Sequence, residues 1–91
     1  MYQITTYSFD KADKLGLTIK PSTNPTKKID VFKNNIKIAS CGAIGYSDYP
    51  TYIKTRGKKY ADERKRLYRI RHQSDRKVIG SNGYYADKLL W

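Results

Sequence analysis

The basic stretch PTYIKTRGKKYADERKRLYRIRH, residues 50–72, decides how the rest of the chain folds. Its apolar residues recur at spacings of three and four, which predicts an α-helix with one buried side. Pro50 suits the first turn, because its missing N–H would have no partner there, and Ser47 or Asp48 can cap the first free amides. Gly57 costs about 1 kcal/mol relative to alanine inside a helix, so it either splits or kinks the segment, and we expect one kinked helix. The predicted apolar stripe consists of Ile53, Tyr60, Ala61, Leu67 and Tyr68.

Positive charge is concentrated in this region. The chain has 91 residues and a formal net charge of +11, and residues 54–77 hold eleven Lys and Arg against Asp62, Glu63 and Asp75, which is +8 of that total. Asp62 and Glu63 can each pair with a nearby cation at helical spacing, but most of the charge stays unneutralised and attracts polyanions. Because an arginine fork binds phosphate with two donors, we expect phosphate-backbone contacts here. The predicted contacts are Lys54, Arg56, Lys58, Lys59, Arg64, Lys65, Arg66, Arg69, Arg71, His72, Arg76 and Lys77.

Tyrosines are interleaved with this charge. Tyr49 and Tyr52 can stack on bases or pack in the core, and the sequence does not decide between these roles. Tyr60 and Tyr68 lie on the apolar side of the predicted helix, so we expect them in the core. The sequence has no helix-turn-helix, zinc-finger or RNA-binding aromatic motif, which indicates recognition of shape or backbone rather than of bases.

Residues suited to catalysis are few. His72, the only histidine, lies near the expected end of the helix, where it can contact the carbonyl terminus or a phosphate. A general base would need a nucleophile or a metal beside it, and the acids are scattered apart from Asp62 and Glu63. We therefore predict no enzyme, no cofactor and no metal site. Cys41, the single cysteine, rules out a disulfide within these residues, fits a reducing compartment and is most simply a small buried side chain.

The N-terminal half predicts a small antiparallel sheet. Residues 28–32 and 36–40 alternate in polarity around the segment 33–35, and asparagine tolerates the left-handed angles of a tight turn, so we expect a hairpin. Ile29 and Val31 mark the face that should meet the long helix, while the other face should meet water.

The segments before the hairpin are shorter. We expect residues 2–6 and 17–20 to be strand-like, and residues 9–15 to form a helix capped by Ser8 and ended by Gly16. Residues 21–26 contain two prolines and should form a mobile loop.

The C-terminal residues 84–91 are apolar at both ends. Burial of a Leu-sized side chain is worth about 1.5–3 kcal/mol, so we expect this tail to dock, with Trp91 in or beside the core. Residues 1–91 thus predict a single α+β domain: an antiparallel hairpin or small sheet packed on one long basic helix, with a short N-terminal helix and a docked C-terminal tail. No run approaches the roughly 18 apolar residues of a membrane span, so we expect a soluble protein.

Two motifs in the C-terminal half resemble those of a known family. An arginine-rich helix motif is followed by a motif that runs from a serine and a glycine to Leu-Trp. This arrangement resembles small basic proteins of large (nucleocytoplasmic) DNA viruses and some bacteriophages. The resemblance implies a viral setting and a virion- or genome-associated role, without a mechanism. It rests on Arg64, Arg66, Leu67, Tyr68, Arg71 and His72, then Ser81, Gly83, Tyr84, Leu90 and Trp91.

The leading hypothesis is a non-enzymatic nucleic-acid-binding protein that contacts the phosphate backbone with low sequence specificity, DNA being favoured over RNA. A homodimer joined through hairpin edges would enlarge the footprint. The alternative is a viral structural protein whose basic face binds an acidic protein partner. A third hypothesis, a small nuclease, requires magnesium-dependent cleavage that is lost on replacing His72 or Glu63. The expected location is intracellular, in the host cytoplasm or nucleus, or packaged in the virion.

Overall fold

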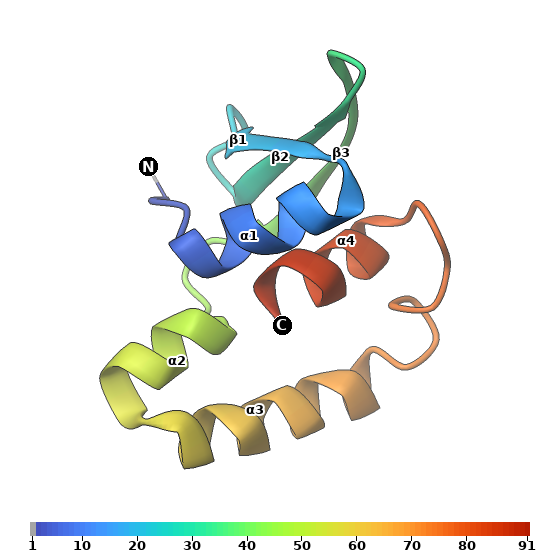
Figure 1. The fold of residues 1–91 in the computed structure, drawn as a ribbon. Helices are drawn as coiled ribbons and strands as arrows, with labels where there is room; N and C mark the ends of the chain where they lie inside the picture. Colours follow the sequence, from blue (N-terminus) through green and yellow to red (C-terminus); the bar gives the residue numbers. More distant parts are fainter. Residues whose placement is uncertain (1) are drawn as a thin grey trace.

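The computed structural model describes residues 2–91, which form four helices and a three-stranded antiparallel sheet that lies at one end of the molecule (Figure 1). The α+β fold class predicted from the sequence is therefore confirmed. None of the helices within residues 2–91 is long and apolar enough to cross a membrane. In chain order the elements are α1 (Thr6–Leu15), β1 (Thr18–Pro21), β2 (Lys27–Lys33), β3 (Ile36–Ala43), α2 (Tyr49–Arg56), α3 (Lys58–Arg71) and α4 (Asn82–Leu90).

The sheet is a meander in the order β1-β2-β3, with β2 in the centre. The predicted hairpin joins β2 to β3, and Asn34 and Asn35 take positive φ angles of 52° and 65° in its turn. Ile29 and Val31 of β2 are fully buried on one face, as their alternation predicted. The hairpin prediction is confirmed.

The opposite face of β2 is not open to water, which corrects the sequence-based expectation. Asp30 is only 3% exposed. Its Oδ1 accepts hydrogen bonds from the hydroxyls of Ser22 at 2.6 Å and Ser40 at 2.7 Å. Ser22 lies in the loop predicted to be mobile, yet it is buried. The loop is held because its polar side chains satisfy a buried carboxylate, which an argument from apolar burial alone overlooks.

A second polar contact on this face holds the N-terminal segment. The Nζ of Lys28 lies 3.0 Å from the Oδ2 of Asp48, and the hydroxyl of Tyr2 donates to the same oxygen at 2.6 Å. Asp48 also caps α2, because its side chain accepts from the amide of Thr51. The segment before α1 is therefore held by the side chain of Tyr2, and it does not form the strand predicted for residues 2–6.

Helix α1 begins earlier than predicted. Thr5 caps it, while Ser8, the expected cap, lies inside the helix, is fully buried and donates to the carbonyl of Leu89 at 2.7 Å. The end of the helix is as predicted, with Gly16 in the left-handed region at φ 71°.

Helices α1 and α4 form the layer that packs on the sheet, and α3 lies beyond them (Figure 1). Leu89, Leu90 and Trp91 are buried, which confirms the docked tail. The main helix contacts of the sheet are therefore with α1 and α4, whereas the sequence had predicted packing on the long basic helix. Cys41 is fully buried in this core, and burial raises the pKa of its thiol to about 12.

The basic segment is two helices rather than one kinked helix. Gly57 has φ 90° and ψ 164°, and it ends α2 and begins α3. Because a new helix begins at Gly57, the residues of the predicted apolar stripe do not lie along one side of a single helix. Ile53 and Tyr60 are 38% and 41% exposed, while Ala61 and Tyr68 provide the buried side of α3.

Candidate nucleic-acid interface

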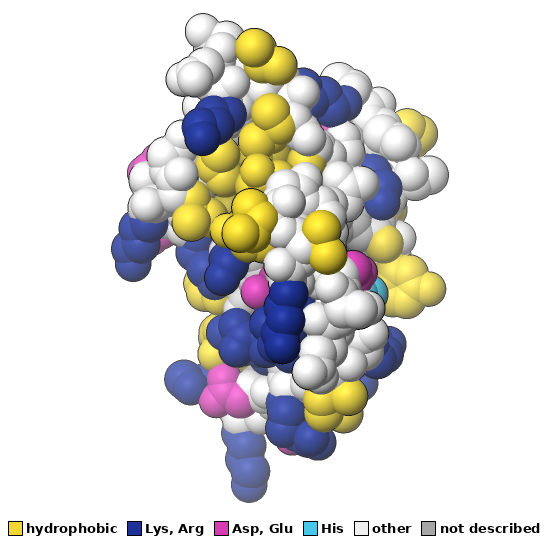
Figure 2. All heavy atoms as spheres, turned by 90° about the vertical axis from the view of Figure 1, so that its right-hand side faces the viewer, with side chains coloured by type: hydrophobic (Ala, Val, Ile, Leu, Met, Phe, Trp, Pro, Cys, Tyr) yellow, Lys and Arg dark blue, Asp and Glu magenta, His cyan; other side chains and the backbone are white. Residues whose placement is uncertain are grey.

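The predicted cations lie at the end of α2, along α3 and in the segment that follows α3. Figure 2 shows Lys and Arg side chains gathered over the lower half of one face, at the level of α3. Four of the eleven Lys and Arg in residues 54–77 have a carboxylate within 4.0 Å. The pairs are Lys58–Asp62 at 2.8 Å, Arg66–Glu63 at 2.5 Å, Arg69–Asp87 at 3.4 Å and Arg76–Asp87 at 4.0 Å.

The other seven cations of this segment form no ion pair with a carboxylate in residues 2–91. The local pairs of Asp62 and Glu63 were predicted from helical spacing, and they leave most of the positive charge unneutralised, as expected. The seven are Lys54, Arg56, Lys59, Arg64, Lys65, Arg71 and Lys77.

Basic side chains surround α3 on three sides. Residues seven positions apart lie on the same side of an α-helix, because seven residues make nearly two turns. Ala61 and Tyr68, seven apart, face the core. Three further pairs with this spacing occupy the other sides and form basic rows. These rows are Lys58 with Lys65, Lys59 with Arg66, and Arg64 with Arg71.

The two tyrosines proposed for base stacking are enclosed by the protein. Tyr49 is 8% exposed, its hydroxyl donates to Asp62 at 2.6 Å, and the Nζ of Lys65 lies 4.7 Å from its ring centroid. Tyr52 is half-buried, with its ring 6.1 Å from that of Trp91. Of the two roles left open, the structure therefore favours core packing, most clearly for Tyr49.

Tyr60 is the more exposed aromatic on α3, although the sequence placed it in the core. The residue is 41% exposed, the guanidinium of Arg56 lies over its ring at 5.3 Å from the centroid, and the ring of Tyr52 lies 5.4 Å away. The sequence missed this because the helical phase changes at Gly57.

His72 lies at the C-terminal end of α3, as predicted. Its Nδ1 is 3.1 Å from the Oδ2 of Asp75, and its ring stacks on Tyr68 with centroids 4.4 Å apart. The hydrogen bond with His72 lowers the pKa of Asp75. In the part of the chain that the structure describes, no group of three His, Cys, Asp or Glu residues is placed to hold a metal ion.

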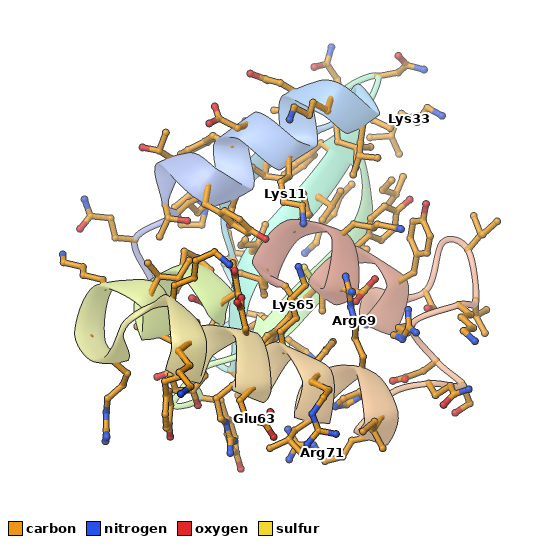
Figure 3. The ribbon with its side chains drawn as sticks, turned by 60° about the horizontal axis from the view of Figure 1, so that its bottom comes forward. Lys11, Lys33, Glu63, Lys65, Arg69 and Arg71 are labelled. Atoms are coloured by element: carbon orange, nitrogen blue, oxygen red, sulfur yellow. The ribbon has the colours of Figure 1, made fainter. Side chains whose placement is uncertain are left out.

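A shallow groove runs along one side of α3 and onto the segment after it. Lys11 of α1, which lies far from the basic segment in sequence, points toward Lys65 and Arg69 beside this groove (Figure 3). Sequence reasoning missed Lys11, because no pattern in the chain relates it to α3. The groove is lined by Asp62, Lys65, Arg66, Arg69, Ile70, Gln73 and Arg76.

Comparisons with protein-family models, with curated proteins and with solved structures find no match for this chain. The resemblance to viral proteins therefore stays a prediction.

Proposed function

We propose that this α+β protein is a non-enzymatic nucleic-acid-binding protein that holds the phosphate backbone along α3 with little sequence preference. The observation that carries the proposal is the unpaired positive charge: seven of the eleven Lys and Arg in residues 54–77 have no carboxylate partner within residues 2–91. A surface that neutralises several phosphates draws its affinity from the release of counterions.

The distribution of acids strengthens this argument. Three of the eight carboxylates, those of Asp30, Asp48 and Asp87, are at most 3% exposed. They neutralise charge inside the protein and present little negative charge to a ligand. Only the other five acidic side chains are exposed to a ligand, and the positive surface potential should be strongest where the three basic rows lie.

The geometry favours backbone contacts over base readout. The cations surround α3 on three sides instead of converging on one edge, which suits a charged strand lying alongside the helix. Tyr60, with Arg56 beside it, can add sequence-tolerant stacking on an unpaired base. The sequence resemblance would place such a protein with a viral genome.

The test is a titration of the full chain with duplex DNA, single-stranded DNA and RNA at two salt concentrations. On duplex DNA the affinity should fall with salt by a log–log slope of about 0.9 per phosphate contacted. Lys59→Gln should weaken binding and reduce this slope by about one contact. Lys33→Gln is the matched control, because it removes the same charge from the hairpin turn, away from α3 (Figure 3).

Two results would contradict the proposal. If no nucleic acid binds at low salt, an acidic protein partner becomes the better explanation of the basic surface. If Lys33→Gln and Lys59→Gln weaken binding equally, net charge and not the surface of α3 is responsible.

A further inference from the structure

Asp87 of α4 is a buried carboxylate that faces more cations than it can neutralise. It is 3% exposed. The Nε of Arg69 lies 3.4 Å from its Oδ1, and the Nη1 of Arg76 lies 4.0 Å from its Oδ2. Both separations exceed the 2.7–2.9 Å that is usual for a charge-assisted hydrogen bond. The Nε of Arg76 is buried and has no hydrogen-bond partner in the described residues.

Lys11 of α1 points toward Lys65 and Arg69 of α3 at the same place (Figure 3). The Nζ of Lys11 donates to the hydroxyl of Tyr7 at 3.2 Å and has no carboxylate partner among residues 2–91. Lysine ammonium groups crowded together in this way repel one another unless an anion lies between them.

The protonation equilibria of two lysines reflect this crowding. Burial, and then the positive charge of Lys65, lower the pKa of Lys11. Burial, and then the positive charge of Arg69, lower the pKa of Lys65. A bound anion would reverse the repulsive part of both effects.

We call this group the Asp87 cluster. It differs from the exposed row of Lys59 and Arg66 in being recessed, because Lys11, Lys65 and Arg76 are half-buried; Lys65 belongs both to the cluster and to the row with Lys58. Asp62, at the edge of the groove, is bound by Lys58 and by the hydroxyl of Tyr49, and its charge acts on Lys65 only from a longer distance. The cluster consists of Lys11, Lys65, Arg69 and Arg76 around Asp87.

We infer that the Asp87 cluster is a binding site for a phosphomonoester dianion. Four cations lie around one carboxylate, which leaves an excess that a doubly charged phosphate would largely neutralise. Such a group carries a charge of about −1.5 to −2 near pH 7 and offers three acceptor oxygens. A backbone diester carries one charge and is flanked by sugars on both sides, so it suits the projecting rows and not a recess. Resting on the proposed function, the inference identifies the ligand as the terminal phosphate of a nucleic-acid strand.

The first arm of the test uses inorganic phosphate and no nucleic acid. Thermal unfolding of the full chain is followed in phosphate and in chloride at matched ionic strength. Phosphate should raise the midpoint temperature of the native protein above the value in chloride. The rise should disappear in Lys11→Gln and return in Lys11→Arg. It should persist in Lys14→Gln, an exposed lysine of the same helix outside the cluster.

The second arm compares one oligonucleotide with a 5′-phosphate and with a 5′-hydroxyl end. The native protein should bind the phosphorylated strand about tenfold more tightly, which corresponds to about 1.4 kcal/mol, and Lys11→Gln should lose this preference. Binding of both strands with equal affinity, without stabilisation by phosphate, would overturn the inference and leave the proposed function intact. Stabilisation by phosphate without binding of any oligonucleotide would keep the site and remove the proposed function.

Discussion

Tyr68 of α3 stacks on Trp91, with ring centroids 4.5 Å apart and ring planes inclined by 12°. The ring of Tyr68 also stacks on His72, with centroids 4.4 Å apart. Only Ala61 and Tyr68 are buried within α3. The stack on Trp91 is therefore the main contact that fixes the basic helix to the core, and it sets where the three basic rows lie.

Tyr68→Ala should destabilise the protein strongly. Removing a large buried aromatic side chain costs about 3–5 kcal/mol of unfolding free energy, because water does not make up for the contacts that the ring loses. Tyr68→Phe keeps the stack and should cost less than about 1.5 kcal/mol. Urea unfolding, followed by the fluorescence of the single tryptophan, measures both. Equal costs for the two substitutions would show that the stack does not anchor α3.

Gly42→Ala and Gly45→Ala should differ although both glycines have positive φ, at 79° and 94°. Each alanine incurs the strain of a left-handed conformation, about 1–2 kcal/mol. A Cβ at Gly42 would also lie 2.6 Å from the Cδ1 of Leu90 and 3.1 Å from the Cβ of Lys28, whereas a Cβ at Gly45 meets no atom within 4 Å.

Overpacking adds about 1–3 kcal/mol, so Gly42→Ala should lower the unfolding free energy more than Gly45→Ala by that amount. Urea unfolding of the two variants measures the difference. Similar losses would show that α4 can move away from β3 without cost.

The sequence predicted the features that a few adjacent residues determine. Gly16 ends α1, Asn34 and Asn35 form the hairpin turn, and Asp48, one of the two caps the sequence offered, caps α2. Each of these features depends on the backbone angles or free amides of its immediate neighbours. The charge of α3 was equally visible, since it needs only the residues of one helix.

The sequence did not predict contacts between distant polar residues. Ser8, expected as a helix cap, is buried and donates to the carbonyl of Leu89. Lys28, expected on the face that meets water, is buried and pairs with Asp48. In both cases the fold brings a partner from a distant part of the sequence. The Asp87 cluster was not predicted for the same reason, because Lys11 lies near α3 only when α1 and α4 pack together.

Acid should destabilise the protein through Asp30. Burial opposes ionisation of this carboxyl, but hydrogen bonds from Ser22 and Ser40 outweigh it and lower the pKa of Asp30 from 3.8 to about 2. Because the folded pKa lies below the unfolded one, the stabilisation is complete above about pH 4 and is lost as the pH falls toward 2.

Unfolding free energies measured across this pH range test the claim. Asp30→Asn should be less stable than the native protein at neutral pH and should show a flatter decline between about pH 4 and 2. Asp13→Asn, at an exposed position of α1, is the control and should follow the native curve. A native-like slope in Asp30→Asn would mean that other carboxyls govern the acid transition.

Asp87→Asn should destabilise the protein in a manner that depends on salt and on phosphate. The substitution removes the one buried negative charge among the four cations of the Asp87 cluster, and losing a hydrogen-bonded charge costs about 1.5–3 kcal/mol. The remaining repulsion is screened as salt rises, since the Debye length falls from about 10 Å at 0.1 M to 3 Å at 1 M. The loss of unfolding free energy in urea should therefore be largest at low salt, and phosphate should restore more of it than chloride at the same ionic strength. Asp10→Asn, which changes net charge equally at an exposed site, should show neither dependence. If the loss of unfolding free energy in Asp87→Asn depends on neither salt nor phosphate, Asp87 acts only as a local hydrogen-bond acceptor and its cations do not repel one another.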